Sequence, residues 1–118
     1  MLYVVPVTVV EMPEFLSMTP RLMTDDERNA LVDFLACNPT AGDLVPETGG
    51  LRKLRWALEG RGKRGGARVI HFFHSPRMPL FIITAYAKNE REDISAADRK
   101  RYRAFAKLVS DQYRGAKR

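Results

Sequence analysis

Cysteine and histidine are scarce in this sequence, and their scarcity narrows the kinds of site that it can form. The single cysteine, Cys37, cannot form an internal disulfide, and the lack of any Cys-x-x-Cys pair excludes a thiolate zinc site. The two histidines, His71 and His74, would point to opposite faces of a strand at their spacing. No cluster of Asp and Glu is spaced to hold a divalent cation. We therefore expect no metal and no other cofactor.

Long hydrophobic runs are also missing. The best apolar stretches, LYVVPVTVV and PLFIITAYA, are about half as long as a membrane-spanning helix and are rich in strand formers. The N-terminus has no positively charged leader and soon reaches Glu11 and Glu14. With a lone cysteine, these features predict a cytoplasmic protein without a membrane partner. Its 118 residues, 45% of them hydrophobic, suit one domain over 1–118.

Acidic side chains are few in the second half of the chain. Residues 1–50 hold eight acids and two bases, whereas residues 51–118 hold six acids and eighteen bases. A basic half of this strength indicates a polyanionic partner, of which nucleic acid is the commonest in a cytoplasm. A solvated basic face with no partner is the alternative that charge alone leaves open.

The hydrophobic pattern predicts an α+β fold in the order β-α-α-β-β-β-α. A Val-rich strand is expected at 2–10, where Pro6 favours an edge position. A short helix over 12–18 should end at Thr19-Pro20. A second helix begins at a capping box of Thr24 and Glu27 and ends at Asn38-Pro39.

Residues 40–50 are rich in Gly, Pro and Asp and predict a loop, and three strands follow at 51–56, 68–74 and 80–87. Ser95 and Asp98 open a last helix, and its apolar stripe is Tyr102, Phe105, Val109 and Tyr113. We expect the helices to cover one face of a mostly antiparallel sheet.

The strand order predicts where basic side chains meet. In a meander, the end of the first strand lies beside the start of the second, which lies beside the end of the third. This brings Arg55, Arg68 and residues 86–89 to one end of the sheet. The basic, glycine-rich loop hangs over the same end, and its charges are Arg61, Lys63 and Arg64.

Side-chain alternation puts Lys53 and Arg55 on a common face, and likewise Tyr86 and Lys88. Such a patch can bind phosphates through arginine forks, and its aromatic ring could stack on a base. It could also cleave RNA, which carries its own nucleophile in the 2′-OH. Arg68 would then stabilise the phosphorane, and a lysine crowded by other cations would act as the base. The residues alone leave open that the patch only holds RNA, or that Arg68 merely pairs with a carboxylate such as Asp93.

Three segments, NPTAGDLVPETGGLRKLRW, GRGKRGGARVI and AYAKNEREDIS, resemble the RelE-type toxins of bacterial toxin–antitoxin pairs. The resemblance spans roughly residues 24–100 and is nearest to the HigB branch of the RelE/ParE superfamily. It implies a small antiparallel sheet with helices packed on it. It also implies a metal-independent endoribonuclease that cuts mRNA on the ribosome. The implied partner is a cognate antitoxin, HigA-like with a helix-turn-helix, and we expect no homo-oligomer without it.

The resemblance carries over residue by residue. Arg68 matches the arginine that opens the strand after the loop, and Asn89 stands where RelE itself has an arginine. Glu47 stands where relatives commonly have glycine, and the tyrosine of the family's C-terminal segment has only Tyr86 and Tyr102 as candidates. The predicted catalytic residues are Lys53, Arg55, Arg68, Tyr86 and Lys88. The predicted RNA-binding residues are Arg52, Arg61, Lys63, Arg64, His71 and Asn89.

Two other functions remain open at this point. A ParE-like inhibitor would bind DNA gyrase and cut nothing, leaving translation normal. A non-catalytic module would bind RNA or an antitoxin without cleaving mRNA, and Asn89 together with the unassigned tyrosine keeps this alternative open.

Overall fold

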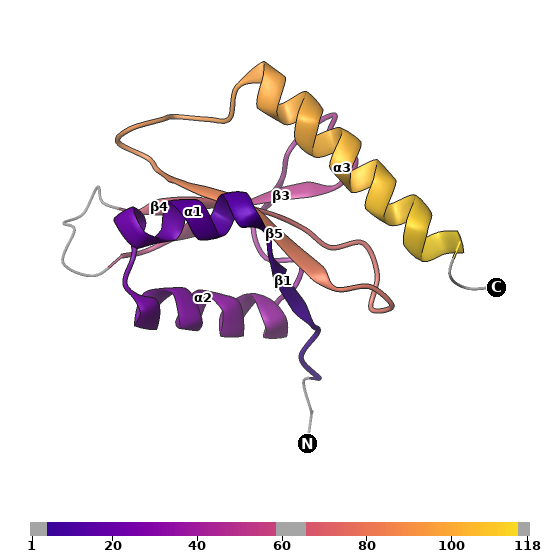
Figure 1. Cartoon of the computed structure of the whole chain (residues 1–118), viewed down its shortest axis with the longest axis horizontal. Helices are drawn as coiled ribbons and strands as arrows, with labels where there is room; N and C mark the ends of the chain where they lie inside the picture. Colours follow the sequence, from indigo (N-terminus) through magenta and orange to yellow (C-terminus); the bar gives the residue numbers. More distant parts are fainter. Residues whose placement is uncertain (1–4, 59–65, 116–118) are drawn as a thin grey trace.

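The computed structural model describes residues 5–58 and 66–115 (Figure 1). This part of the chain forms one five-stranded sheet, in the order β1-β5-β4-β3-β2, and three helices. The expected basic loop residues Arg61, Lys63 and Arg64 lie outside the described residues. The elements in chain order are β1 (Val9–Glu11), α1 (Pro13–Leu22), α2 (Asp25–Cys37), β2 (Asp43–Leu44), β3 (Leu51–Trp56), β4 (Ala67–Phe72), β5 (Leu80–Ala87) and α3 (Ala96–Gly115).

The three-strand meander is as predicted, and both ends of the sheet add to it. β3, β4 and β5 pair antiparallel in sequence order. β1 lies at the edge beside β5 and runs parallel to it, with Val9 opposite Leu80. Residues 2–4 of the expected strand lie outside the described residues. Among the described ones the strand begins only at Val9, because the N–H of Val7 donates to the carbonyl of Ala36 in α2 (2.9 Å) rather than to a strand.

The segment 40–50 was predicted to be a loop, and this is wrong for two of its residues. Asp43 and Leu44 form β2, which pairs antiparallel with Lys53 and Arg52. The preceding Gly42 has a φ of 94° and lies against β3, where an added Cβ would be 2.7 Å from the carbonyl oxygen of Lys53. The glycine that looked like a loop signal instead lets the backbone approach β3 closely.

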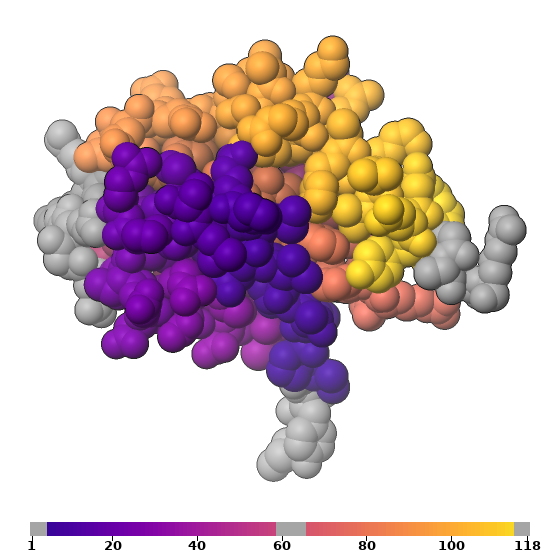
Figure 2. Space-filling model, viewed as in Figure 1, coloured from indigo at the N-terminus to yellow at the C-terminus, as the bar shows by residue number. Residues whose placement is uncertain are grey.

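Helices cover both faces of the sheet, so the expectation of one covered face is wrong. Alternate residues of β4 point to opposite sides, Val69 into a core with α1 and α2 and Ile70 into a core with α3. β5 is buried at every position from Leu80 to Tyr86, and an apolar run buried on both sides needs cover on both. α1 and α2 occupy the front of the molecule in Figure 2, and α3 forms a separate flank at its upper right.

The first helix continues through the predicted stop at Thr19-Pro20. Pro20 has no N–H to donate to the carbonyl of Leu16, which lies one turn earlier. The hydroxyl of Thr19 donates to that carbonyl instead (3.1 Å), so the helix extends to Leu22 with its acceptor satisfied.

The predicted caps of the other two helices are confirmed. Thr24 and Glu27 form a reciprocal capping box at the start of α2. The hydroxyl of Ser95 accepts a hydrogen bond from the N–H of Asp98 (3.0 Å) at the start of α3. The α3 stripe packs as expected, with Tyr102 and Val109 in the core on the second face of the sheet.

Candidate nucleic-acid interface

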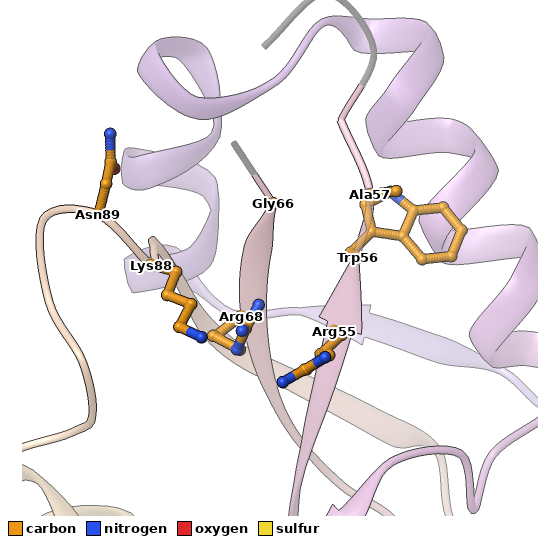
Figure 3. A pocket seen from close by; sticks show the side chains of 7 residues that line it. All are labelled: Arg55, Trp56, Ala57, Gly66, Arg68, Lys88 and Asn89. Carbon is orange, nitrogen blue, oxygen red and sulfur yellow. The ribbon is translucent and has the colours of Figure 1, made fainter. Parts of the chain in front are cut away.

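Three cationic side chains from three neighbouring strand ends converge on one hollow, and we call them the cationic cluster: Arg55, Arg68 and Lys88. Arg55 is directly opposite Arg68 in the β3–β4 register, and Arg68 is opposite Tyr86 in the β4–β5 register. The turn after β5 stays attached to β4, because the N–H of Lys88 donates to the carbonyl of Gly66 (3.3 Å). Figure 3 shows the charged ends of the cluster pointing into a common space. The remaining lining residues are Trp56, Ala57, Gly66 and Asn89.

The charge of the cluster is uncompensated within the described part of the chain. No carboxylate of residues 5–58 or 66–115 forms an ion pair with Arg55, Arg68 or Lys88. Arg68 makes one contact to the backbone, from Nη1 to the carbonyl oxygen of Ala67 (3.3 Å). Two guanidinium forks and an ammonium on one wall are suited to an anion with several oxygens, such as a phosphodiester.

Lys53 does not join the cluster, although it shares a face with Arg55. Its Nζ is 3.2 Å from Oδ1 of Asp93, in the segment between β5 and α3. Asp93 also pairs with Arg99 of α3 (3.5 Å). Asp93 therefore lies beside the predicted basic patch and neutralises one of its lysines. The partner suggested for Asp93 was Arg68, whereas the structure pairs it with Lys53 and Arg99.

Both candidate tyrosines are buried. Tyr86 is only 2% exposed, and its hydroxyl has no hydrogen-bond partner among the described residues. Burial and the charge of Asp93 raise the pKa of Tyr86, and Arg91 covers its ring at 5.4 Å. Tyr102 donates to Oε2 of Glu14 (2.5 Å) inside the core, where burial raises its pKa. Neither ring is presented to a base in the hollow.

His71 is fully buried on the other face of the sheet. It is opposite Arg52 and Ile82, in the layer that packs against α1 and α2. Its Nε2 donates to the carbonyl of Ala41 (2.8 Å), and burial lowers its pKa to about 4. His71 therefore ties the start of the β2 segment to β4 and does not reach the cationic cluster.

The other predicted RNA-binding residues are divided by position. Asn89 lines the hollow, but its amide points away from the cluster (Figure 3). Arg52 is on the His71 face, where its Nη1 donates to the carbonyl of Gly42 (3.1 Å).

Trp56 and Gly66 also line the hollow, and neither was predicted to do so from the sequence. The indole of Trp56 turns away from the cluster (Figure 3) and packs against Phe34 of α2, with ring centroids 5.5 Å apart. Gly66 lies between Trp56 and Arg68, and a Cβ added there would make only an ordinary contact, 3.4 Å from the carbonyl oxygen of Trp56.

No group of three or more His, Cys, Asp and Glu side chains in residues 5–58 and 66–115 could hold a metal ion. No helix in the described ranges is both long and apolar enough to cross a bilayer.

Comparison with known families agrees with the resemblance noted in the sequence. Residues 40–115, which are more than half of the chain, match the family model described as the RelE toxin of the RelE/RelB toxin–antitoxin system. The matched range begins just before β2 and contains β2, β3, β4, β5 and α3, and therefore the whole cationic cluster. A match to this family implies an α+β fold, a role as a toxin and an antitoxin partner. The chain belongs to the RelE toxin family of toxin–antitoxin systems.

Proposed function

We propose that this toxin is a ribosome-dependent endoribonuclease that cuts mRNA and so inhibits translation. The observation that carries the proposal is the convergence of Arg55, Arg68 and Lys88 on one hollow, with no ion pair to a described carboxylate. Three cations gathered on one wall, with no ion pair to a described carboxylate, suit a ligand that brings its own negative charge.

The chemistry needs only groups that the RNA and this wall can supply. The 2′-oxygen of the RNA attacks the adjacent phosphorus, and the bond from phosphorus to the 5′-oxygen breaks, leaving a 2′,3′-cyclic phosphate. Lys88 would accept the proton of the 2′-OH. Arg68, at the centre of the cluster, would stabilise the additional negative charge of the phosphorane, and Arg55 would hold the phosphate oxygens.

Two predicted catalytic side chains receive smaller roles in this proposal. Lys53 would stay in its 3.2 Å ion pair with Asp93 and would not act as the base. Tyr86, which is opposite Arg68 in the β4–β5 register, would support the Arg68 side chain by packing, since its ring is buried. The leaving 5′-oxygen would then take its proton from water or from the ribosome-bound substrate.

The ribosome enters the proposal because the hollow presents charge and no base-reading pocket. Trp56 is the one aromatic residue among those that line the hollow in the described part of the chain, and its ring turns away from the cluster (Figure 3). Positioning of the codon would therefore come from the ribosome, while this chain supplies electrostatic stabilisation. The antitoxin would be HigA-like, with a helix-turn-helix, and would neutralise the toxin by covering this basic wall.

The test is a reconstituted translation reaction with a defined mRNA, run with and without ribosomes, in which new 5′ ends are mapped by primer extension. Wild type is compared with Arg68→Ala and with Arg21→Ala, which removes an exposed arginine of α1, a helix on the other face of the sheet. We expect cuts that require ribosomes, disappear in Arg68→Ala and persist in Arg21→Ala.

The other outcomes refute the nuclease proposal in distinguishable ways. Intact mRNA with normal translation would point to a gyrase inhibitor, which a supercoiling assay would then detect. Intact mRNA with blocked translation would leave a module that binds the ribosome without cutting.

A further inference from the structure

A second basic hollow lies along α3, and we call it the α3 groove. Its helical wall is formed by Lys100, Arg103, Lys107 and Arg114, which recur at the three-, four- and seven-residue spacings of one helix face. The opposite wall is formed by Gly49 and His74. Because Tyr102 and Val109 bury the other side of α3, these cations are the solvent-facing stripe of a helix already anchored in the core.

The groove keeps a net positive charge after its internal ion pairs are counted. Asp111 is its one acid, and it pairs with both Lys107 (2.9 Å) and Arg114. Lys100 and Arg103 are exposed and form no ion pair with any residue in 5–58 or 66–115. A ligand of the α3 groove would therefore be anionic.

The shape of the groove suits a chain-like ligand. Residues 100 to 114 rise about 21 Å along the helix, with about 5 Å per turn. Cations spread along the helix at positions 100, 103, 107 and 114 match the repeating charge of a polynucleotide better than they match a single small anion. The lining also includes Ala104 and Ala106, whose small side chains, like the absent side chain of Gly49, leave the backbone of a ligand room to approach.

Ion pairs link the start of α3 to the face of β3 that carries Arg55 of the cationic cluster. Lys100 and Arg103 of the groove also line a smaller neighbouring hollow, together with Glu47, Ala96 and Arg99. Arg99 pairs with Asp93, which pairs with Lys53, and Lys53 shares a face of β3 with Arg55 of the cluster. A strand that leaves the cluster along this face meets neutralised charge at Asp93 and then the open cations of α3.

We propose that the α3 groove binds the phosphate backbone of the RNA strand that continues beyond the cleaved bond. This inference rests on the proposed function, which brings RNA to the cluster. It adds a substrate-binding surface that holds RNA by charge, without reading its sequence. The groove would determine how long a stretch of RNA the toxin engages, while the cluster determines where the phosphodiester is attacked.

The test measures binding of two fluorescent single-stranded RNAs, one of about 4 nucleotides and one of about 16, over a range of salt concentrations. Each cation that is removed should reduce the steepness of the plot of log affinity against log salt by about 0.7. At about 0.1 M salt this corresponds to a roughly fivefold lower affinity. We expect Arg103→Gln to lower the affinity for the long RNA roughly fivefold. The double variant Lys100→Gln/Arg103→Gln should lower it about 20-fold. The short RNA, which fills only the cluster, should be unaffected in both variants.

Arg21→Gln is the matched control, because it removes one exposed arginine from a helix on the other face of the sheet. The groove proposal would be overturned if Arg21→Gln and Arg103→Gln bound the long RNA with equal affinity. It would also be overturned if the wild type bound the two RNAs with equal affinity. A third outcome is that the double variant Lys100→Gln/Arg103→Gln loses binding to an oligoglutamate peptide while its RNA affinity is unchanged. That outcome would assign the groove to an acidic protein segment and would also overturn the RNA proposal. Loss of mRNA cutting in Arg68→Ala is scored separately, so the proposed function can stand when the groove fails.

Discussion

Lys53 and Asp93 form an ion pair of 3.2 Å at the side of the cationic cluster, although they are 40 residues apart. Asp93 is also held by the N–H of Ile94 (2.8 Å) and by Arg99. Partial burial alone would raise the pKa of Asp93, but these hydrogen bonds and charges lower it, so it stays ionised. The pair connects β3 to the segment that leads into α3, and it keeps one lysine of the basic face out of the hollow.

Asp93→Asn should strengthen anion binding at the cluster. The substitution releases Lys53 and removes a negative charge from the path of a phosphate, so affinity for a short RNA should rise about fivefold at about 0.1 M salt. Because the pair is partly exposed, the free energy of unfolding should fall by less than about 1 kcal/mol. RNA titration and thermal melting measure the two effects. Asp33→Asn removes an exposed charge on α2 and should change neither; an equal gain in Asp33→Asn would reduce the effect to net charge.

Arg68→Lys should lose most of the mRNA cutting even though it keeps the charge. A guanidinium presents a planar fork to two phosphate oxygens, whereas an ammonium acts as a single point charge. We expect the rate of cutting to fall at least tenfold in the ribosome assay, with short-RNA affinity changed by less than about threefold. The matched change Arg21→Lys should have no effect. A fully active Arg68→Lys enzyme would show that only the charge at position 68 is needed.

Tyr86→Phe separates a packing role from a chemical one. The buried hydroxyl has no partner among the described residues, so its removal should leave the free energy of unfolding unchanged or raise it by up to about 1 kcal/mol. Cutting should stay within about twofold of wild type, because the ring that supports Arg68 is kept. A denaturant titration and the ribosome assay give the two numbers. A large loss of cutting in a fully folded Tyr86→Phe protein would assign the hydroxyl to proton transfer.

The convergence of Arg55, Arg68 and Lys88 could be predicted because strand order and two-residue alternation are local rules that the sheet obeys. The pairing of Lys53 could not, because Asp93 lies in an irregular segment whose path depends on tertiary packing. The same holds for Tyr86, whose face was predicted correctly but whose depth depends on Arg91 and the segment that cover it. Alternation gives the side of a sheet, not whether another element covers that side.

Several predictions of secondary structure and packing were wrong because groups elsewhere in the fold override the local sequence signal. Pro20 should stop a helix, yet Thr19 supplies the missing donor. The run in β5 fits one buried face or two equally well, and only the docking of α3 decides between them. Glu47 adopts a φ of 62°, a left-handed conformation that favours glycine, the residue expected there from the family resemblance.

Gly42→Ala should destabilise the protein much more than Gly49→Ala. Both glycines have positive φ, so each alanine carries a backbone strain of about 1 kcal/mol. At position 42 the new Cβ would also lie 2.7 Å from the carbonyl oxygen of Lys53, whereas at position 49 it would meet nothing within 4 Å. We expect a difference of about 2 kcal/mol or more between the two variants, measured by urea unfolding. Equal losses would mean that β2 moves away from β3 at little cost.

His71 should make the stability of the fold depend on pH. Burial holds its pKa at about 4, against 6.5 for an ordinary histidine, so the folded protein keeps the ring neutral while the unfolded chain takes up a proton. Stability is therefore full above about pH 6.5 and falls as the pH drops toward 4. Between pH 7 and pH 5 the loss from this residue should be about 2 kcal/mol.

His71→Gln should remove most of that pH dependence. Glutamine has no titrating group, and its amide N–H can still donate to the carbonyl of Ala41, the acceptor that Nε2 uses in the wild type. The carboxyl of Glu14 does not interfere, because its hydrogen bonds to Tyr102, Thr84 and Arg101 lower its pKa despite partial burial, so its contribution is lost only at more acidic pH. Urea midpoints at pH 7 and pH 5 give the slope, and His74→Gln, an exposed site, should behave as wild type. Equal slopes in His71→Gln and wild type would mean that His71 is protonated in the folded protein and that its surroundings accommodate the charge.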